Sequence, residues 1–213
     1  MPLSTTPMVF VVDNEIAVRE SLAILIQKAG WQPQTFASAT EFLAHQRIAA
    51  PCCLIMDLTL PDINGFELQE RISTERREMP IIFLSSHAEI PMVVQAMRRG
   101  ALEFLIKPFD ANVLLSAIRC AIKRSEMTLT REMELHGLRS NYESLTCRER
   151  EVMSGVVVGL LNKQVGTELG ISEITVKAHR GNVMRKMRAD SFAQLVNMAS
   201  RLRVVRYLAT SAA

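Results

Sequence analysis

In the first half of the chain, two kinds of segment follow one another in turn. One kind is a short run that is either apolar throughout or alternates between apolar and polar residues. The other kind has the periodicity of an amphipathic helix. The short runs predict β-strands, at Met8–Val12, Gln32–Phe36, Cys52–Asp57, Pro80–Ser85 and Glu103–Ile106. The amphipathic stretches predict helices, at Ile16–Ala29, Ala39–Gln46, Gly65–Ser73, Ile90–Arg99 and Ala111–Ile122. Strands that alternate with helices pair in parallel, with helices on both faces of the sheet. We therefore expect an α/β fold with a five-stranded parallel sheet.

The rear of the chain has helical periodicity and no strand pattern. Thr146 and Glu149 have the spacing of a capping box, which predicts a helix start. Three further helices are predicted, at Asn162–Leu169, Glu173–Met187 and Ser191–Arg203. The charged segment between the halves predicts a helical linker at 123–144, with a flexible tether as the alternative. We thus expect a first domain at 1–122 and an all-α, four-helix domain at 145–213.

The two halves of the chain differ in charge. The whole chain has 25 Lys and Arg against 22 Asp and Glu, a net charge of +3. Met1–Cys120 holds 10 basic and 13 acidic residues, whereas Leu145–Ala213 holds 11 and 5. A basic domain is typical of proteins whose partner is a polyanion, so the charge favours nucleic-acid binding by the rear.

Composition favours a folded cytoplasmic protein with no membrane partner. Hydrophobic residues make up 48% of the chain, enough for buried cores. No apolar run reaches the roughly 18–20 residues of a membrane span, and Met1–Pro7 lacks the features of a signal peptide. The cysteines have no metal-ligand spacing, and we expect buried free thiols; they are Cys52, Cys53, Cys120 and Cys147.

Polar residues stand at the ends of four predicted strands. They are Asp13, Asp57, Ser85 and Lys107. The carboxyl ends of parallel strands meet at one edge of a sheet, where α/β proteins collect their chemistry. Carboxylates that converge there repel one another unless a cation neutralises them, and their oxygens suit Mg²⁺. A lysine and a hydroxyl beside them suit the oxygens of a phosphoryl group.

These segments closely resemble the receiver domains of response regulators, over roughly Val9–Ile122. The matching segments are Val11–Glu15, Met56–Gly65, Leu84–Ser86 and Lys107–Phe109. The resemblance implies a flavodoxin-like (βα)5 fold in which Asp57 accepts a phosphoryl group. It also implies a switch hydroxyl at Ser85, an aromatic switch at Phe104 and a phosphate counter-ion at Lys107. The Lys107–Pro108 bond is expected to be cis, and His87 is expected at the rim of the pocket.

The expected metal site contains one departure from the family pattern. The resemblance implies Mg²⁺ ligands at Asp13, Asn14, Asp57 and the backbone carbonyl of Thr59. Receivers usually carry an acid where Asn14 stands, so one ligand charge is missing and we expect weaker Mg²⁺ binding. Two readings stay open: a receiver that still takes phosphate at Asp57, or an atypical receiver or interaction module that works without phosphate.

The rear helices resemble the LuxR-type helix-turn-helix domain, over about Leu145–Met198. The matching segments are Leu145–Val152, Gly159–Lys163 and Leu169–His179. The resemblance implies base contacts from the second helix and phosphate contacts around it. The expected DNA-binding residues are Lys163, Thr175, Lys177, Ala178, Arg180, Gly181 and Arg185.

Together the two domains resemble a NarL/FixJ-type response regulator of the FixJ/StyR branch. The resemblance implies a transcriptional regulator, usually an activator, that a sensor histidine kinase switches by phosphorylating Asp57. Phosphorylation is expected to favour a homodimer that binds double-stranded promoter DNA, with RNA polymerase as a further partner. An enzyme acting on small phosphate compounds is the competing class. The C-terminal domain, however, has no group of residues typical of a catalytic site, and we expect that the protein is not an enzyme.

Overall fold

The computed structural model describes residues 6–86 and 89–204, so the expectation for His87 lies outside the described residues. The chain divides into two compact units, Met1–Thr130 and Arg131–Ala213. The division falls inside one long helix, α5 (Ala111–Glu143), which includes nearly all of the segment expected as a linker. The domain boundaries at 122 and 145 stay a prediction.

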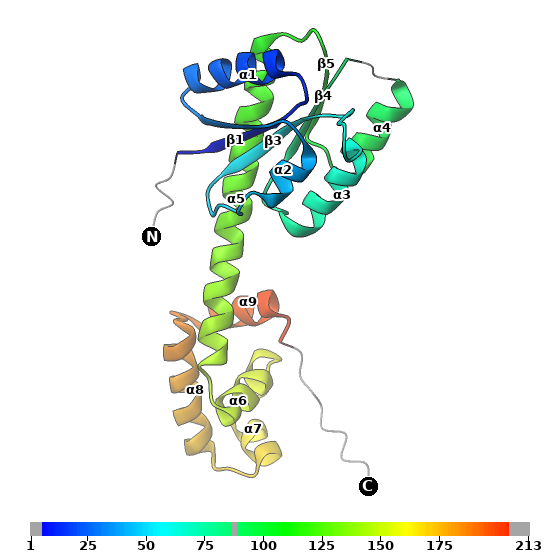
Figure 1. Ribbon diagram of the computed structural model, residues 1–213. Coiled ribbons are helices and arrows are strands. Elements are labelled where there is room, and N and C mark those ends of the chain that lie inside the picture. Colours follow the sequence, from blue (N-terminus) through cyan, green and yellow to red (C-terminus); the bar gives the residue numbers. More distant parts are fainter. Residues whose placement is uncertain (1–5, 87–88, 205–213) are drawn as a thin grey trace. The chain divides into compact units, whose positions relative to one another are not determined.

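The first unit contains the expected parallel sheet (Figure 1). Its described strands are β1 (Met8–Val12), β2 (Gln32–Phe36), β3 (Cys52–Asp57), β4 (Ile81–Ser85) and β5 (Glu103–Ile106). They are ordered β2-β1-β3-β4-β5, so the chain crosses from one side of β1 to the other between β2 and β3. The bounds of these strands equal the predicted ones except that β4 begins at Ile81 and not at Pro80. Pro80 has no N–H to donate to the neighbouring strand, and only its carbonyl takes part, as the acceptor for Leu54 N.

Helices cover both faces of this sheet, and each face has its own apolar core. The remaining helices of the unit are α1 (Ile16–Lys28), α2 (Ala39–Ala44), α3 (Gly65–Glu75) and α4 (Ile90–Arg98). Ile26 of α1 and Ile118 of α5 pack on one face, while Phe42 of α2 and Ile72 of α3 pack on the other. This is the doubly wound α/β architecture that the sequence predicts.

Packing of the first unit extends along α5 beyond Ile122. The Ser125 side chain is fully buried, and its hydroxyl oxygen accepts a hydrogen bond of 3.0 Å from the backbone N–H of Cys52. Leu129, one turn further along, is 8% exposed. The amino end of the central strand β3 is therefore fixed by a residue that the sequence assigned to the linker.

The second unit contains the expected four helices, in addition to the end of α5. They are α6 (Cys147–Val157), α7 (Asn162–Leu169), α8 (Glu173–Met187) and α9 (Phe192–Leu202). The capping box at Thr146 is confirmed: its hydroxyl accepts from Glu149 N, and Glu149 accepts from Thr146 N. Val152, Val176 and Leu195 belong to one core that joins α6, α8 and α9.

The cysteines are free, but only two of the four are buried. Burial raises the pKa of the Cys52 thiol to about 11 and that of Cys53 further, so both stay protonated. Cys120 and Cys147 are exposed, which corrects the expectation that all four are buried. Within the described ranges, the helices are all too short or too polar to cross a membrane.

Candidate functional site

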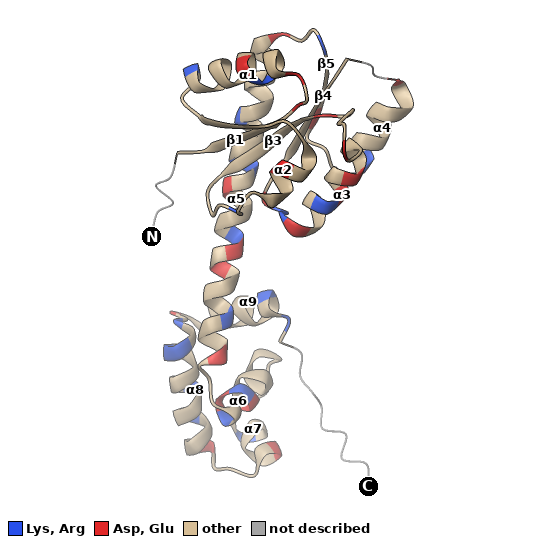
Figure 2. Ribbon diagram, in the orientation of Figure 1, with Lys and Arg blue, Asp and Glu red and all other residues tan. Residues whose placement is uncertain are grey.

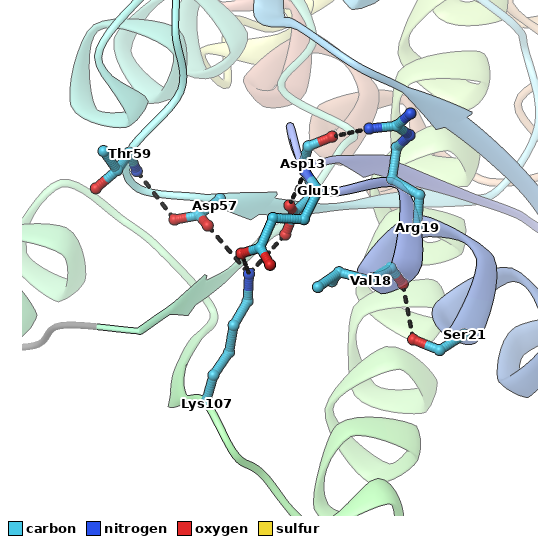
Figure 3. A network of polar contacts seen from close by, with 8 residues as sticks. All are labelled: Asp13, Glu15, Val18, Arg19, Ser21, Asp57, Thr59 and Lys107. Carbon is cyan, nitrogen blue, oxygen red and sulfur yellow. Dashed lines mark hydrogen bonds and ion pairs between the residues drawn. The ribbon is translucent and has the colours of Figure 1, made fainter.

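The four polar residues that were expected to converge lie at the carboxyl edge of the sheet. Asp13 directly follows β1, Asp57 ends β3, Ser85 ends β4 and Lys107 directly follows β5. Because β1, β3, β4 and β5 are consecutive neighbours in the sheet, these positions lie side by side. Figure 3 shows the Lys107 side chain reaching from the far strand toward the carboxylates.

The Lys107 ammonium bridges the two buried aspartates. Its Nζ donates to Asp13 Oδ2 at 2.7 Å and to Asp57 Oδ2 at 3.0 Å. Burial alone would lower the pKa of Lys107, but the hydrogen bonds to the two aspartates outweigh it and raise that pKa above its ordinary value. The lysine is therefore a fixed positive charge in this site. The Lys107–Pro108 bond is cis, as expected.

Backbone N–H groups hold the second oxygen of each aspartate. Glu15 N donates to Asp13 Oδ1 at 2.9 Å, and Thr59 N donates to Asp57 Oδ1 at 3.0 Å. Arg19 secures the same turn, since it donates to the backbone carbonyl of Asp13 at 2.7 Å. Asp13 is 1% exposed and Asp57 is 6% exposed, so neither carboxylate can move far. Each aspartate is aimed by the loop that follows it.

Glu15 is the residue of this site that the sequence reasoning missed. Its Oε1 lies 3.8 Å from Lys107 Nζ, and oxygens of Asp13, Glu15 and Asp57 all lie within 4.8 Å of one another. The sequence clue to its role was the presence of an acid two positions after Asp13. In the structure, the hydrogen bond from Glu15 N to Asp13 turns the chain back toward the pocket. The set thus contains three carboxylates and one ammonium, an excess of two negative charges.

A cavity of about 220 Å³ opens beside these charges. Its lining residues are Asn14, Glu15, Asp57, Thr59, Ser85 and Ser86. The cavity therefore brings together the expected acceptor Asp57, the expected hydroxyl of Ser85 and two further expected ligand positions, Asn14 and Thr59. Phe104 lies inside the domain, 9% exposed, with its ring centroid 5.8 Å from that of Phe83. The expected aromatic switch therefore has a ring that is already buried in this structure.

Gly65 positions the loop that carries Thr59. A Cβ at Gly65 would lie 2.9 Å from both the Cα and the carbonyl oxygen of Leu58, closer than side chains approach backbone. Gly65 N also donates to Leu58 O at 3.0 Å. Only glycine lets the start of α3 approach the end of β3 this closely. The short loop between them is thereby held against the cavity.

Helix α8 carries most of the residues expected to bind DNA, and Figure 2 marks its Lys and Arg residues in blue. Lys177, Ala178, Gly181 and Arg185 on α8 are exposed, as is Lys163 on α7. Lys177 pairs with Glu173 at 3.1 Å, Arg185 donates to Asn182 Oδ1 at 3.2 Å, and the Thr175 hydroxyl contacts Ser172 Oγ at 2.8 Å.

Arg180 differs from the other residues of this set because its partners lie on other helices. It donates to Asn162 Oδ1 at 3.2 Å, and its guanidinium carbon lies 4.7 Å from the ring centroid of Phe192. These contacts join α8 to the start of α7 and to α9. The side chain is half-buried, so a base contact by Arg180 would require it to leave both partners.

Lys186 also lies inside the domain. Its Nζ donates to Glu149 Oε2 at 2.6 Å and to the carbonyl of Ser144 at 3.2 Å. Glu149 is 3% exposed, and the hydrogen bond from Lys186 is the main cause of its lowered pKa. Lys186 is on the same helix as most of the expected DNA-binding residues, but its hydrogen bonds fasten α8 to the start of α6.

Comparison with known proteins agrees with both halves of the molecule. Residues 9–119 match the response regulator receiver domain, and residues 143–199 match the bacterial regulatory proteins of the luxR family. The chain therefore belongs to the response regulator family. It is a two-component, DNA-binding transcription regulator with a receiver and a LuxR-type helix-turn-helix domain.

Similar proteins match nearly the whole chain. The response regulator protein TodT of Pseudomonas putida is 40% identical over 196 residues, which cover 92% of this chain and 86% of TodT. Nodulation protein W of Bradyrhizobium diazoefficiens is 42% identical over 199 residues, 93% and 88% of the two chains. The solved structure of the response regulator StyR is similar with a TM-score of 0.81 at 42% identity, covering 92% of this chain and 100% of StyR.

Proposed function

We propose that a sensor histidine kinase phosphorylates Asp57 and thereby favours a homodimer of this regulator that binds promoter DNA. The observation that carries the proposal is the Lys107 ammonium between Asp13 and Asp57, beside a cavity lined by Ser85 and Thr59. A carboxylate, a fixed cation and a hydroxyl are the groups that an incoming phosphoryl group needs. The free thiols fit a cytoplasmic protein.

The chemistry assigned to the chain's own residues is a phosphoryl transfer. A carboxylate oxygen of Asp57 attacks the phosphorus, the P–N bond to the kinase histidine breaks, and an acyl phosphate forms. The negatively charged phosphoryl oxygens attract the Lys107 ammonium and accept a hydrogen bond from the Ser85 hydroxyl. The Lys107 and Ser85 side chains thereby move relative to β4 and β5. The transfer biases an existing equilibrium between two receiver conformations rather than creating a new fold.

The donor set fits Mg²⁺. Carboxylate oxygens of Asp13, Glu15 and Asp57 lie within 4.8 Å of one another, and hard oxygen ligands of this kind suit that ion. Asn14 and the Thr59 carbonyl are further candidate ligands in the same cavity. When bound, Mg²⁺ would neutralise charge on the transferring phosphoryl group. The excess of two negative charges supports this assignment.

For DNA binding we propose that α8 enters the major groove as the recognition helix. Lys177, Ala178 and Gly181 would face base edges, while Lys163, Thr175 and Arg185 would contact phosphates. Arg180 is assigned a weaker part, because Asn162 and Phe192 already engage it. A dimer would place two such helices on successive half-sites, and RNA polymerase is the expected further partner at a promoter.

Labelling with a small acyl phosphate and Mg²⁺ tests the acceptor. Mass spectrometry of the intact chain should show one phosphoryl adduct on the wild type and none on Asp57→Asn. Dimer fraction and DNA affinity should rise with the adduct in the wild type alone. Stoichiometric labelling of the variant at Asp13 would contradict the proposal. A dimer fraction that is the same with and without the adduct would also contradict it.

Two lysine variants test the assignment of α8. Lys177→Ala should relax sequence preference and cost roughly 1–3 kcal/mol at one base pair. Lys163→Ala should weaken binding to all sequences alike and reduce the salt slope by about one. The measurement is a salt titration on specific and scrambled duplexes. Equal weakening on both duplexes by Lys177→Ala would move this lysine to the phosphate contacts.

A further inference from the structure

Helix α8 has an apolar line directly opposite its buried side. Val176, Val183 and Met187 are fully buried and share one side of the helix. With 3.6 residues per turn, the line on the opposite side contains Ile174, Ala178, Gly181 and Arg185. All four are exposed, and the Ile174 side chain is 79% exposed. Only the last of these side chains can form hydrogen bonds.

Within residues 131–204, nothing explains the glycine in this line. A Cβ at Gly181 would meet no atom within 4 Å, and its φ lies outside the left-handed region. Gly166 on α7 is different, because a Cβ there would lie 2.8 Å from the carbonyl of Ile171. Glycine destabilises a helix interior relative to alanine. Where no internal contact needs it, a helical glycine leaves the backbone open to close approach by a partner.

The charges around the line indicate that this partner is DNA. Lys177 is exposed next to the line on α8, Arg185 ends the line, and α7 carries a further exposed cation, Lys163. In the major groove, base pairs offer hydrogen-bonding groups and one apolar group, the C5-methyl of thymine. Ile174 and Ala178 have no donor or acceptor to offer the polar groups. The thymine methyl is therefore the base feature that complements this line.

We propose that the line of Ile174, Ala178 and Gly181 reads thymine methyl groups. This inference rests on the proposed role of α8 as the recognition helix and adds its specificity. Ile174 contacts a methyl group directly, and Gly181 lets the helix backbone lie deep enough in the groove for that contact. The three residues span about 10 Å along the helix, which corresponds to roughly three base pairs.

Replacement of thymine by uracil removes the methyl group and leaves base pairing unchanged. The duplexes are first selected from a random-sequence pool by the full chain treated with a small acyl phosphate. Each dT of the selected site is then replaced by dU, at constant salt. At one or two positions the wild type should lose about fourfold in affinity, the equivalent of one buried methyl group. At the position that Ile174 contacts, Ile174→Ala should bind the dT and dU duplexes equally.

Ile24→Ala is the matched control, since Ile24 on α1 is 55% exposed and lies in the other unit. It should retain the full effect of uracil. A wild type that tolerates dU at every position overturns the inference, as does an uracil effect of equal size in Ile174→Ala. In both cases, selection of a specific sequence would leave the DNA-binding proposal intact. A pool that yields no preferred sequence would overturn both.

Gly181→Ala tests the close approach separately. The added methyl has open space within the domain, so the thermal stability of the variant should match or exceed that of the wild type. Its affinity for the selected duplex should nevertheless fall several-fold, because the methyl group would lie between the helix and the bases. Unchanged or tighter DNA binding by a stable Gly181→Ala would show that the helix does not approach closely there.

Discussion

Lys107 in the first unit and Lys186 in the second both donate to a carboxylate that is almost completely buried. Around Lys186 the charges balance, since one ammonium meets one carboxylate and Thr146 N donates to the same Glu149 oxygen. Around Lys107 one ammonium meets three carboxylates beside a cavity. The balanced Lys186–Glu149 pair stabilises the fold. The cluster around Lys107 keeps a net negative charge, which a further cation can neutralise.

Removal of one charge from the balanced pair should have the largest effect. Glu149→Gln should destabilise the second unit by about 3 kcal/mol, at the lower end for a buried pair because the Lys186 side chain is 27% exposed. Since Lys186 lowers the pKa of Glu149, its contribution is present above the ordinary value of 4.5 and is lost as the pH falls through the lowered pKa. Calorimetry of the full chain should therefore show a difference from wild type that shrinks below pH 4.5.

Glu151→Gln provides the control for this substitution. Glu151 lies on the same helix and pairs with Arg148 at 2.9 Å, but both side chains are about half exposed. An exposed pair of this kind contributes less than about 1 kcal/mol. If Glu149→Gln costs no more than Glu151→Gln, the distinction between the two lysine clusters fails.

In the unbalanced cluster, the number of charges should determine the affinity for Mg²⁺. Glu15→Gln should weaken binding of the ion, and Asn14→Asp should tighten it, each by roughly tenfold for one ligand charge. The double variant, with the same formal charge as the wild type, should bind Mg²⁺ with similar affinity. Titration calorimetry measures all four proteins, with Glu20→Gln on α1 as the control for net charge. A Glu15→Gln affinity equal to that of wild type would remove Glu15 from the metal set.

The smallest effect should have the opposite sign from that of Glu149→Gln. In buffer without Mg²⁺, Asp57→Asn should stabilise the first unit by about 1 kcal/mol, because two repulsions within 4.8 Å outweigh one attraction at 3.0 Å. With saturating Mg²⁺ the first unit of the wild type should be more stable than that of Asp57→Asn, because the wild type binds the ion more tightly. Trp31, the single tryptophan, reports unfolding of this unit alone. Destabilisation by Asp57→Asn under both conditions would mean that the cluster is a balanced network.

Strand and helix positions followed from the sequence because each is a local pattern with a visible end. The apolar runs before Asp13 and Asp57 gave the strands, and the parallel order brought their ends together. Glu15 was missed because its place depends on a turn made by its own backbone N–H. The internal contacts of Arg180 and Lys186 could not be predicted from a local pattern, because their hydrogen-bond partners lie many residues away in sequence.

The hydrogen bond between Ser125 and Cys52 has a consequence for any attempt to isolate the receiver. A truncation after Ile122 would remove Ser125, the acceptor for Cys52 N. Strand β3 begins at Cys52 and ends at Asp57, so the cut would loosen one end of the strand that carries the acceptor at the other. A fragment ending at Thr130 keeps this hydrogen bond. The phosphorylation rate of the shorter fragment would therefore misrepresent that of the intact regulator.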